Sequence, residues 1–370
     1  MKRLIFFALT VIFIFPVSPA NAAAPLVITE PTHRLIDGKF INDQLSTKLL
    51  PTGELGKIVF NIRNINKDWR VDPATLEEIT AMSNGYGVID GSTPAGQQIA
   101  KDWLAQFYRI TRAQSVTAII YGNPSEYWVK KLLPEQIEYL KATSEIKLEE
   151  YLGRAVAGTI GVNSTQQKLS KSVQSAFVFA DKQFILMQTL VDQKEFTFLK
   201  LRMAQLLNPA ITSAELTPLF KDFQSSFNQS RNKLRISKSK FTVTSSKQEL
   251  PITVINEFGS NVKVKLTTRA LNSKVIVRPT EAIELAANSK LQVLLPIEVL
   301  ASGDSSLLTQ LSNLDNKPIG FPVYISLKLS VISPVATWIT SGAAIILFAA
   351  AVFQSVRRFR RGQGKVARGQ

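Results

Sequence analysis

The 370-residue chain has no cysteine and only one histidine, His33. The absence of cysteine excludes thiol chemistry, disulfides and cysteine-ligated zinc, and one histidine cannot form a multi-histidine metal site. A triad of serine, histidine and aspartate would have to use His33. Phosphate loops, dinucleotide fingerprints and EF-hand spacings are also missing. We therefore predict no metal and no cofactor, and a stability that comes from hydrophobic cores.

Long apolar runs are scarce, and the one that is long enough to cross a membrane as a helix is Val335–Val356. At about 1.5 Å rise per residue it matches a hydrocarbon core of roughly 30 Å, and Trp338 lies where an interfacial ring anchors the outer end. Four arginines follow at once: Arg357, Arg358, Arg360 and Arg361. The positive-inside rule then predicts a transmembrane helix over residues 335–356 of a single-pass protein of the cell membrane, with a basic cytoplasmic tail over residues 357–370.

The N-terminus has the three parts of a secretory signal peptide. Lys2 and Arg3 form a basic start, Leu4–Phe15 is an apolar stretch too short to span a bilayer, and Ala20–Ala22 has the small residues of a cleavage site. We predict a signal peptide over residues 1–22, with an uncleaved anchor as the alternative. Everything from residue 23 to the membrane helix is then extracytoplasmic.

Acidic residues are few, with 28 Asp and Glu against 44 Lys and Arg and a formal net charge of +16. The two ends carry eight positive charges and no acid, which leaves 16 − 8 = +8 for the extracytoplasmic part. A mildly basic exterior suits anionic wall polymers or lipid head groups, but a solvated surface rich in lysine is the simpler explanation. An exported chain rarely meets nucleic acid, so we predict no nucleic-acid partner.

Residues 23–230 alternate between strand-like and helix-like segments. Pro25–Glu30, which is expected at a sheet edge, Lys57–Ile62 and Ser115–Tyr121 have the β-branched and aromatic content of strands. With helices between them, they predict a helix-rich α/β domain with parallel strands. Ligands of such domains lie at the carboxyl ends of strands, where Tyr121 and Asn123 are expected.

Helices are predicted from caps and from apolar residues at helical spacing. Asp72 as a cap and Pro73 in the first turn predict a helix that reaches Met82. The spacing of apolar residues predicts another over Gln97–Arg112, with Trp103 in the core. Further helices are predicted over Glu126–Leu133, Pro134–Tyr151, Gln166–Gln193 and after Ser213 as a cap.

At about Arg231 the apolar period changes from 3.6 to 2. Strand-like segments follow, with turn residues between them: Phe241–Thr244, Leu250–Ile255, Val262–Thr267, Lys274–Val277, Ala282–Leu285, Leu291–Val299 and Val323–Val331. Short strands at this density predict an all-β antiparallel sandwich of immunoglobulin-like type over residues 231–333. Its predicted core includes Phe241, Val254, Val262 and Val323.

Several segments resemble an uncharacterised family of actinobacterial envelope proteins. They are Trp69–Ile79, Met82–Gly87, Ala100–Leu104, Ile120–Ser125, Pro251–Asn256, Ala301–Gly303 and the terminal helix with its arginines. Members of that family pair a barrel-like α/β domain, distantly similar to glycan hydrolases and deacetylases, with an immunoglobulin-like domain and one C-terminal span. Their genes commonly lie beside that of the lipid II flippase. The resemblance implies that the α/β domain over residues 23–230 is a reduced, barrel-like one. It also implies an envelope role without a defined activity, because the function of the family is unknown.

The sequence departs from that family where chemistry would be expected. Asn123 and Ser125 stand at two positions where other members tend to carry acidic residues. Hydrolysis of a glycan usually needs two carboxyl groups beside the bond. Asp72, Asp90 and Asp102 could supply carboxylates, but a helix cap, a turn and an exposed helix face explain them without catalysis.

Two functions are compatible with these residues. The favoured one is a non-catalytic, membrane-anchored binding or scaffold protein of the cell envelope, which binds a wall glycan or an envelope protein during wall assembly. In that case no residue is catalytic, and the ligand-binding candidates are Asp72, Tyr121 and Asn123. The alternative is a glycan-active hydrolase or deacetylase-like enzyme that retains a minimal carboxylate site.

Overall fold

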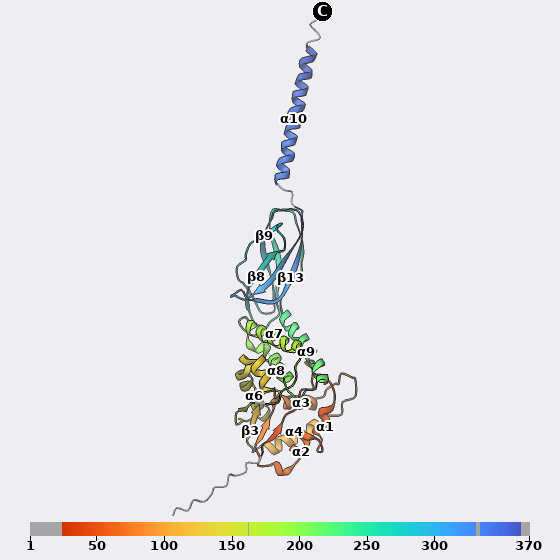
Figure 1. The fold of residues 1–370 in the computed structure, drawn as a ribbon, viewed down its shortest axis with the longest axis vertical. Helices are drawn as coiled ribbons and strands as arrows, with labels where there is room; N and C mark the ends of the chain where they lie inside the picture. Colours follow the sequence, from red (N-terminus) through yellow and green to blue (C-terminus); the bar gives the residue numbers. More distant parts are fainter. Residues whose placement is uncertain (1–23, 162, 331–333, 364–370) are drawn as a thin grey trace, which may run out of the picture. The chain divides into compact units, whose positions relative to one another are not determined.

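The computed structural model describes residues 24–161, 163–330 and 334–363. The predicted signal peptide and the tail from residue 364 onward lie outside these ranges. The chain forms two compact units, whose elements are labelled in Figure 1. The first unit comprises the chain up to Arg34, Gly38–Asn123 and Glu138–Val162, and the second comprises Leu35–Asp37, Pro124–Ile137 and Asn163–Gln370.

A parallel four-stranded sheet organises the first unit, in the order β1-β2-β3-β4. Its strands are β1 (Leu26–Ile28), β2 (Trp69–Val71), β3 (Val116–Ile119) and β4 (Thr159–Ile160). The helices of this unit are α1 (Gln44–Leu49), α2 (Glu54–Val59), α3 (Pro73–Ser83), α4 (Gln97–Thr111) and α6 (Ile137–Leu152). The sheet is open, like a curled half-barrel. The predicted mixture of helices with a parallel sheet, and the placing of the first strand at its edge, are confirmed.

Aromatic side chains fill the core of the first unit. Trp69, Trp103 and Phe107 have no exposed surface. The Trp103 and Phe107 rings stack with centroids 5.2 Å apart, and Trp69 meets Phe107 edge-on at 6.1 Å. The helical spacing of the two α4 residues therefore serves core packing, as predicted for Trp103.

The prediction of a strand over Lys57–Ile62 is wrong, because most of this segment belongs to helix α2 and a following 3-10 turn. Leu55 and Val59 are four residues apart and both buried, so the helical conformation places them on one face. α2 also follows α1 so closely that a Cβ atom on Gly56 would lie 1.7 Å from the carbonyl oxygen of Leu50. Packing here outweighs the strand propensity of the β-branched residues.

The second unit begins with helices. They are α5 (Glu126–Leu132), α7 (Lys171–Met187), α8 (Thr197–Leu206) and α9 (Ser213–Asn232). The cap of α9 is Thr212 and not Ser213, because the Thr212 hydroxyl accepts from the Glu215 amide and the Glu215 carboxylate accepts from the Thr212 amide. The predicted boundary at residue 231 falls at the junction of α9 and β5. There the Arg231 guanidinium lies 4.2 Å from the centre of the Phe321 ring.

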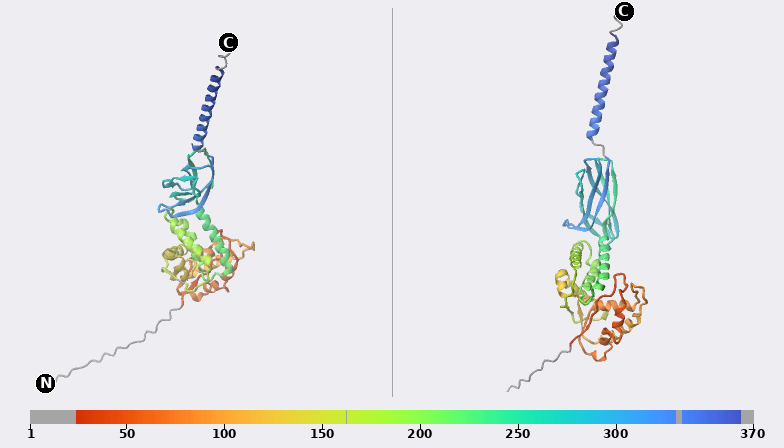
Figure 2. Two further views of the ribbon diagram at one scale, coloured as in Figure 1. Left: turned by 45° about the horizontal axis from the view of Figure 1, so that its top comes forward. Right: turned by 45° about the vertical axis from the view of Figure 1, so that its right-hand side comes forward.

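Two sheets form the β part of the second unit, and Figure 2 shows it from two further sides. One sheet has the order β5-β7-β11-β9, with β5 (Leu234–Ile236), β7 (Lys247–Asn256), β11 (Ser289–Val299) and β9 (Val275–Val277). The other has the order β10-β8-β12-β13-β6, with β10 (Ile283–Leu285), β8 (Val262–Ala270), β12 (Gly303–Ser312), β13 (Pro318–Leu329) and β6 (Lys240–Val243). All pairs are antiparallel except β13 with β6.

Burial alternates along these strands, so both sheets contribute to a shared core. Val254, Val262 and Val323 are buried as predicted. Phe241 is not, because it lies on β6 at a sheet edge and stays partly exposed. The central strand β12 was not predicted from the sequence. Its first residues, Asp304–Ser306, are polar, and they hide the alternation of buried and less buried residues along the strand.

Helix α10 (Pro334–Gln363) carries the long apolar run. Within the described ranges it is the one helix long and apolar enough to cross a membrane, over Trp338–Arg358 with a mean hydropathy of 1.9. Trp338 is 80% exposed, and Arg357 and Arg358 are exposed on the same helix. Arg360 and Arg361 belong to α10, but their side chains lie outside the described part.

Candidate functional site

Polar residues gather at the carboxyl ends of three neighbouring strands in the first unit. β1 is followed by Thr29 and Glu30, β2 by Asp72, and β3 by Ile120 and Tyr121. The parallel register pairs the last residue of β1 with that of β2, so these ends meet at one edge of the sheet. In open α/β sheets this edge is where ligands bind.

Asp72 lies at the centre of this edge and has no exposed surface. Its Oδ1 accepts hydrogen bonds of 2.9 Å from the amides of Ala74, at the start of α3, and Gly122, beyond β3. The Thr29 hydroxyl donates to Oδ2 over 3.4 Å. Asp72 therefore caps α3, as its place before Pro73 indicates, and also joins β2 to the turn after β3.

The same burial changes the acidity of this carboxyl group. Loss of solvent raises the pKa of Asp72 to about 7, against the opposing effect of the two amide hydrogen bonds, and the charge of Glu78 adds to the increase. A carboxyl group of this kind exchanges its proton near neutral pH. Such a group can act as an acid or base only if a substrate reaches it.

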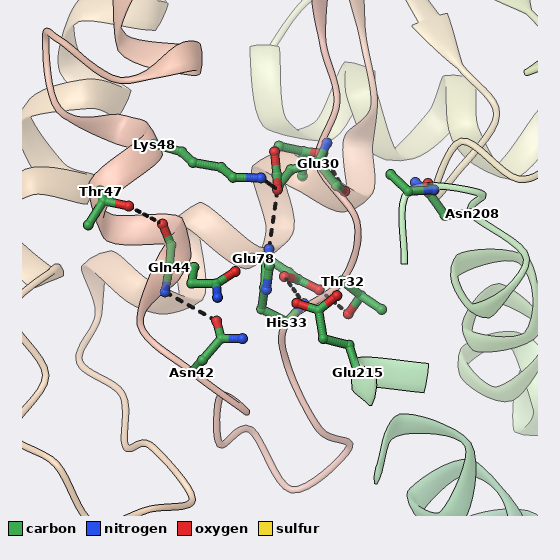
Figure 3. Close-up of polar contacts among 12 residues, drawn as sticks. Glu30, Thr32, His33, Asn42, Gln44, Thr47, Lys48, Glu78, Asn208 and Glu215 are labelled. Atoms are coloured by element: carbon green, nitrogen blue, oxygen red, sulfur yellow. Dashed lines mark hydrogen bonds and ion pairs between the residues drawn. The ribbon is translucent and has the colours of Figure 1, made fainter. Parts of the chain in front are cut away.

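A second buried group surrounds His33 (Figure 3). The Glu78 side chain accepts from the His33 amide over 3.0 Å and from the Thr32 hydroxyl. His33 Nε2 lies 3.3 Å from Glu30 Oε1, and Lys48 forms an ion pair with the same carboxylate. His33, Glu78 and Glu30 are all less than a tenth exposed. These contacts join the segment after β1 to α1 and α3.

Tyr121 is buried beside a fourth acidic residue, Glu77. The Tyr121 hydroxyl donates to Glu77 Oε2 over 3.0 Å, and burial raises the pKa of this phenol well above its usual value. The Lys147 ammonium lies 5.7 Å from the centre of the Tyr121 ring. Glu77 also pairs with Arg34 at 3.0 Å and Lys147 at 3.1 Å. The ring is thus covered by packing and by a lysine, while its hydroxyl points into an ion cluster.

Asn123 ends the turn that follows β3. Its amide donates to the Ile120 carbonyl over 2.7 Å, and its φ of 45°, after a φ of 78° at Gly122, gives two consecutive left-handed residues. Asparagine and glycine are the residues that adopt this conformation at the lowest cost. The structure thus brings the three ligand-binding candidates together, because Asp72 accepts from the amide that lies between Tyr121 and Asn123.

The remaining predicted carboxylates lie elsewhere in the first unit. Asp90 is exposed and accepts from the Ser92 amide over 2.9 Å, as in a turn. Asp102 is exposed on α4 and accepts from the Gln98 side chain. In the described ranges, no group of three or more histidine and acidic side chains has the arrangement of a metal site.

Sequence reasoning missed four members of this edge: Glu30, His33, Glu77 and Glu78. The rule that strand ends carry the site could have found Glu30, which is the last residue of the first predicted strand. Glu77 and Glu78 lie in the first two turns of α3, where only their distance from the strand ends, fixed by the fold, reveals a role. Nothing local distinguishes them from other helical glutamates.

The chain matches a family described as a family of unknown function, DUF6049, over residues 138–364. No curated protein matches it. Among solved structures it is similar to WR4, a C. elegans MSP family member, with 10% identity, 26% of this chain and 97% of that chain covered, and a TM-score of 0.21. It is also similar to an ASH/PapD-like domain of human CEP192, with 15% identity, 27% and 87% covered, and a TM-score of 0.21. Values of this size say nothing about function.

Proposed function

We propose that this chain, which belongs to the DUF6049 family of unknown function, is a membrane-anchored binding or scaffold protein of the cell envelope. In this proposal α10 crosses the cell membrane once. The arginines after Val356 give the orientation, with both folded units extracytoplasmic and the C-terminus cytoplasmic. The two β-sheets of the second unit form an immunoglobulin-like sandwich.

The observation that carries the binding role is the burial of the carboxylates at the strand ends. Asp72 is fully buried, and its Oδ1 is occupied by two backbone amides. Glu78 and Glu30 are buried and engaged with Thr32, His33 and Lys48. A glycan hydrolase needs two carboxyl groups that reach the substrate. Carboxylates whose oxygens already take part in internal hydrogen bonds and ion pairs instead hold the strand ends in place.

The part of the site that faces solvent is the ion cluster Arg34, Glu77 and Lys147. Their side chains are 20%, 18% and 25% exposed. Two cations flank one carboxylate, so the cluster carries a net positive charge and offers both donors and an acceptor. A hydroxyl-rich ligand with an anionic group suits this arrangement, and wall glycans have that chemistry.

The connection with wall assembly comes from the resemblance to actinobacterial envelope proteins. Those proteins combine an α/β domain, an immunoglobulin-like domain and one C-terminal span, and their genes lie near the lipid II flippase. An extracytoplasmic binding protein held at the membrane would meet wall precursors and envelope proteins there. Wall glycan or an envelope protein is therefore the proposed partner.

A glycan-active hydrolase or deacetylase-like enzyme is the second candidate, and one observation favours it. Burial raises the pKa of Asp72 to about 7, and Glu78 contributes to the increase. Pairs of carboxyl groups with shifted pKa values are typical of glycosidases. The enzyme would require an opening of the strand ends that admits a sugar to Asp72.

Binding and hydrolysis are distinguished by assaying both with one preparation. The full chain in detergent is incubated with insoluble wall glycan, and bound protein and released soluble sugar are measured. The variants are Lys147→Gln and Glu77→Gln in the ion cluster, and Asp72→Asn behind it. Lys141→Gln is the matched control, because Lys141 also lies on α6 and also pairs with a glutamate, but that pair is far more exposed.

We expect binding without sugar release, weakened at least several-fold by Lys147→Gln and unchanged by Lys141→Gln. Equal binding by both lysine variants would contradict the assignment of the ion cluster. Sugar release by the parent that is lost in Asp72→Asn would replace the binding role with the hydrolase.

The orientation is tested by cysteine labelling, since the natural chain has no cysteine. A membrane-impermeant maleimide added to intact cells should label a Ser245→Cys variant. It should label a cysteine appended after Gln370 only when the membrane is permeabilised. Labelling of the appended cysteine in intact cells would reverse the proposed topology.

A further inference from the structure

β13 finishes at one end of the sandwich, and at the same end β11 finishes while β9 and β12 begin. In the register, Gly303 at the start of β12 pairs with Leu329 at the end of β13. Val299 at the end of β11 pairs with Val275 at the start of β9. The β8–β9 loop (Leu271–Lys274) and the β11–β12 loop (Leu300–Ser302) therefore lie at the end of the sandwich from which the chain continues toward α10.

The length of the connecting chain limits how far this end can be from the membrane helix. Leu329 and Pro334 are five residues apart, which allows a separation of at most about 18 Å. Trp338 follows after roughly 6 Å of helix. If Trp338 lies at the membrane interface, the two loops are within reach of the lipid head groups.

Each of the two loops presents an exposed leucine. Leu271 is 47% exposed and Leu300 is 56% exposed. The loops are fixed in place, because the Leu300 amide donates to the Lys274 carbonyl over 2.8 Å and the Leu271 amide donates to the Ser306 carbonyl over 3.0 Å. The transfer of exposed apolar side chains from water into an apolar phase is favourable.

The charges at this end are compatible with a lipid surface. Three lysines lie at or next to the ends of strands on this side: Lys247, Lys274 and Lys328. They are opposed by Glu298 and Asp304, which pair in register with Lys247 and Lys328. These three lysines and two acidic residues have a net charge of +1. The leucines, and not the lysines, therefore provide most of the attraction to the lipid surface.

We infer that this end of the sandwich is a lipid-contact surface, on which Leu271 and Leu300 insert into the interfacial layer of the bilayer that α10 crosses. The inference rests on the proposed membrane anchoring and adds a second contact to it. The sandwich is then held against the membrane by its own loops as well as by the span.

The test uses the absence of natural cysteine. Single variants Leu271→Cys, Leu300→Cys and Leu314→Cys of the full chain carry an environment-sensitive fluorophore and are reconstituted into vesicles of phosphatidylcholine and phosphatidylglycerol in equal parts. Leu314 is the matched control, since it is 48% exposed but lies in the β12–β13 loop at the other end of β12, roughly 30 Å away. Quenching by lipids with a nitroxide at the head group is measured.

We expect quenching at positions 271 and 300 to exceed that at 314 several-fold. A label at Ser245→Cys, in the β6–β7 loop of the same end, should lose most of its quenching when both leucines are replaced by serine. Equal quenching at 271, 300 and 314, or no effect of the double replacement on the Ser245 label, would overturn the inference. Vesicle flotation separates the two proposals: protein that does not float with vesicles refutes the anchoring itself, while floating protein without quenching at 271 and 300 refutes the lipid-contact surface alone.

Discussion

Replacing Asp72 by asparagine should stabilise the first unit at neutral and alkaline pH. The introduced asparagine would keep an oxygen in the place of Oδ1, which accepts from the amides of Ala74 and Gly122. Its Nδ2 would take the place of Oδ2 and can donate to the Thr29 hydroxyl, which lies 3.4 Å from Oδ2. The substitution therefore retains the hydrogen bonds and removes a buried negative charge.

The size of the effect follows from the pKa of Asp72, which burial raises to about 7. An aspartate in the unfolded chain has a pKa of about 3.9. The folded state therefore holds a proton that the unfolded state releases, and this contribution to stability is fully present below about pH 4 and is lost as the pH rises through 7. Over this window the natural chain loses up to about 4 kcal/mol relative to the asparagine variant, at about 1.4 kcal/mol per pH unit.

The free energy of unfolding is measured in urea between pH 4 and pH 8, with the full chain in detergent. Trp69 and Trp103 report on the first unit when Trp128 and Trp338 are replaced by phenylalanine, because both lie in its core. The two curves should nearly coincide at pH 4 and diverge up to pH 7, with the asparagine variant the more stable.

Asp72→Ala is the control for the hydrogen bonds. It removes the charge as asparagine does, but leaves two buried amides without an acceptor, at about 1 to 3 kcal/mol each. It should be less stable than Asp72→Asn by a similar amount at every pH. Destabilisation by Asp72→Asn at pH 8, or a stability relative to the natural chain that does not change with pH, would contradict a raised pKa of the buried Asp72.

Three further substitutions test packing and hydrogen bonding. Gly56→Ala should destabilise the first unit by about 3 kcal/mol or more, because the new Cβ would lie 1.7 Å from the Leu50 carbonyl oxygen; a thermal unfolding midpoint equal to that of the natural chain would contradict the close approach of α1 and α2. Asn256→Ala should cost about 3 kcal/mol in urea unfolding of the second unit, because the fully buried amide of Asn256 makes three hydrogen bonds to backbone groups; a cost below about 1 kcal/mol would show that these bonds are dispensable. Tyr121→Phe should cost only about 1 kcal/mol, because Glu77 keeps its two cationic partners; a cost like that of a lost core residue would mean that the hydroxyl organises the whole ion cluster.

The burial of Asp72 also bears on the choice between binding and hydrolysis. In an enzyme, the stability that the fold loses when the buried Asp72 ionises would be explained by the role of this carboxyl group as a catalytic acid or base. In a binding protein the same residue is explained by the backbone amides that it joins. A stabilised Asp72→Asn variant that still binds wall glycan would agree with the second explanation.

Local signals in the sequence determined a large part of this fold. The pair Asp72-Pro73 begins α3 at the predicted residue, since a cap and a fixed φ act within one turn. The apolar repeat of α4 and the alternation along β7, β8 and β13 are also local properties, and Val254 and Val262 are buried as they indicate. The single apolar run gives α10 in the same way, because its length and composition alone decide whether it can span a bilayer.

Only the tertiary structure decided which polar residues meet. Glu30, His33 and Glu78 come together because β1 and β2 pair in parallel, and that pairing joins positions more than 40 residues apart. Tyr121 is buried, and α6 brings Lys147 over its ring. The helix at Glu54–Val59 has the same origin, since its strand-forming residues are overruled by contacts with the core. Neither propensity nor spacing along the chain contains these long-range contacts, which arise only when the strands and helices pack.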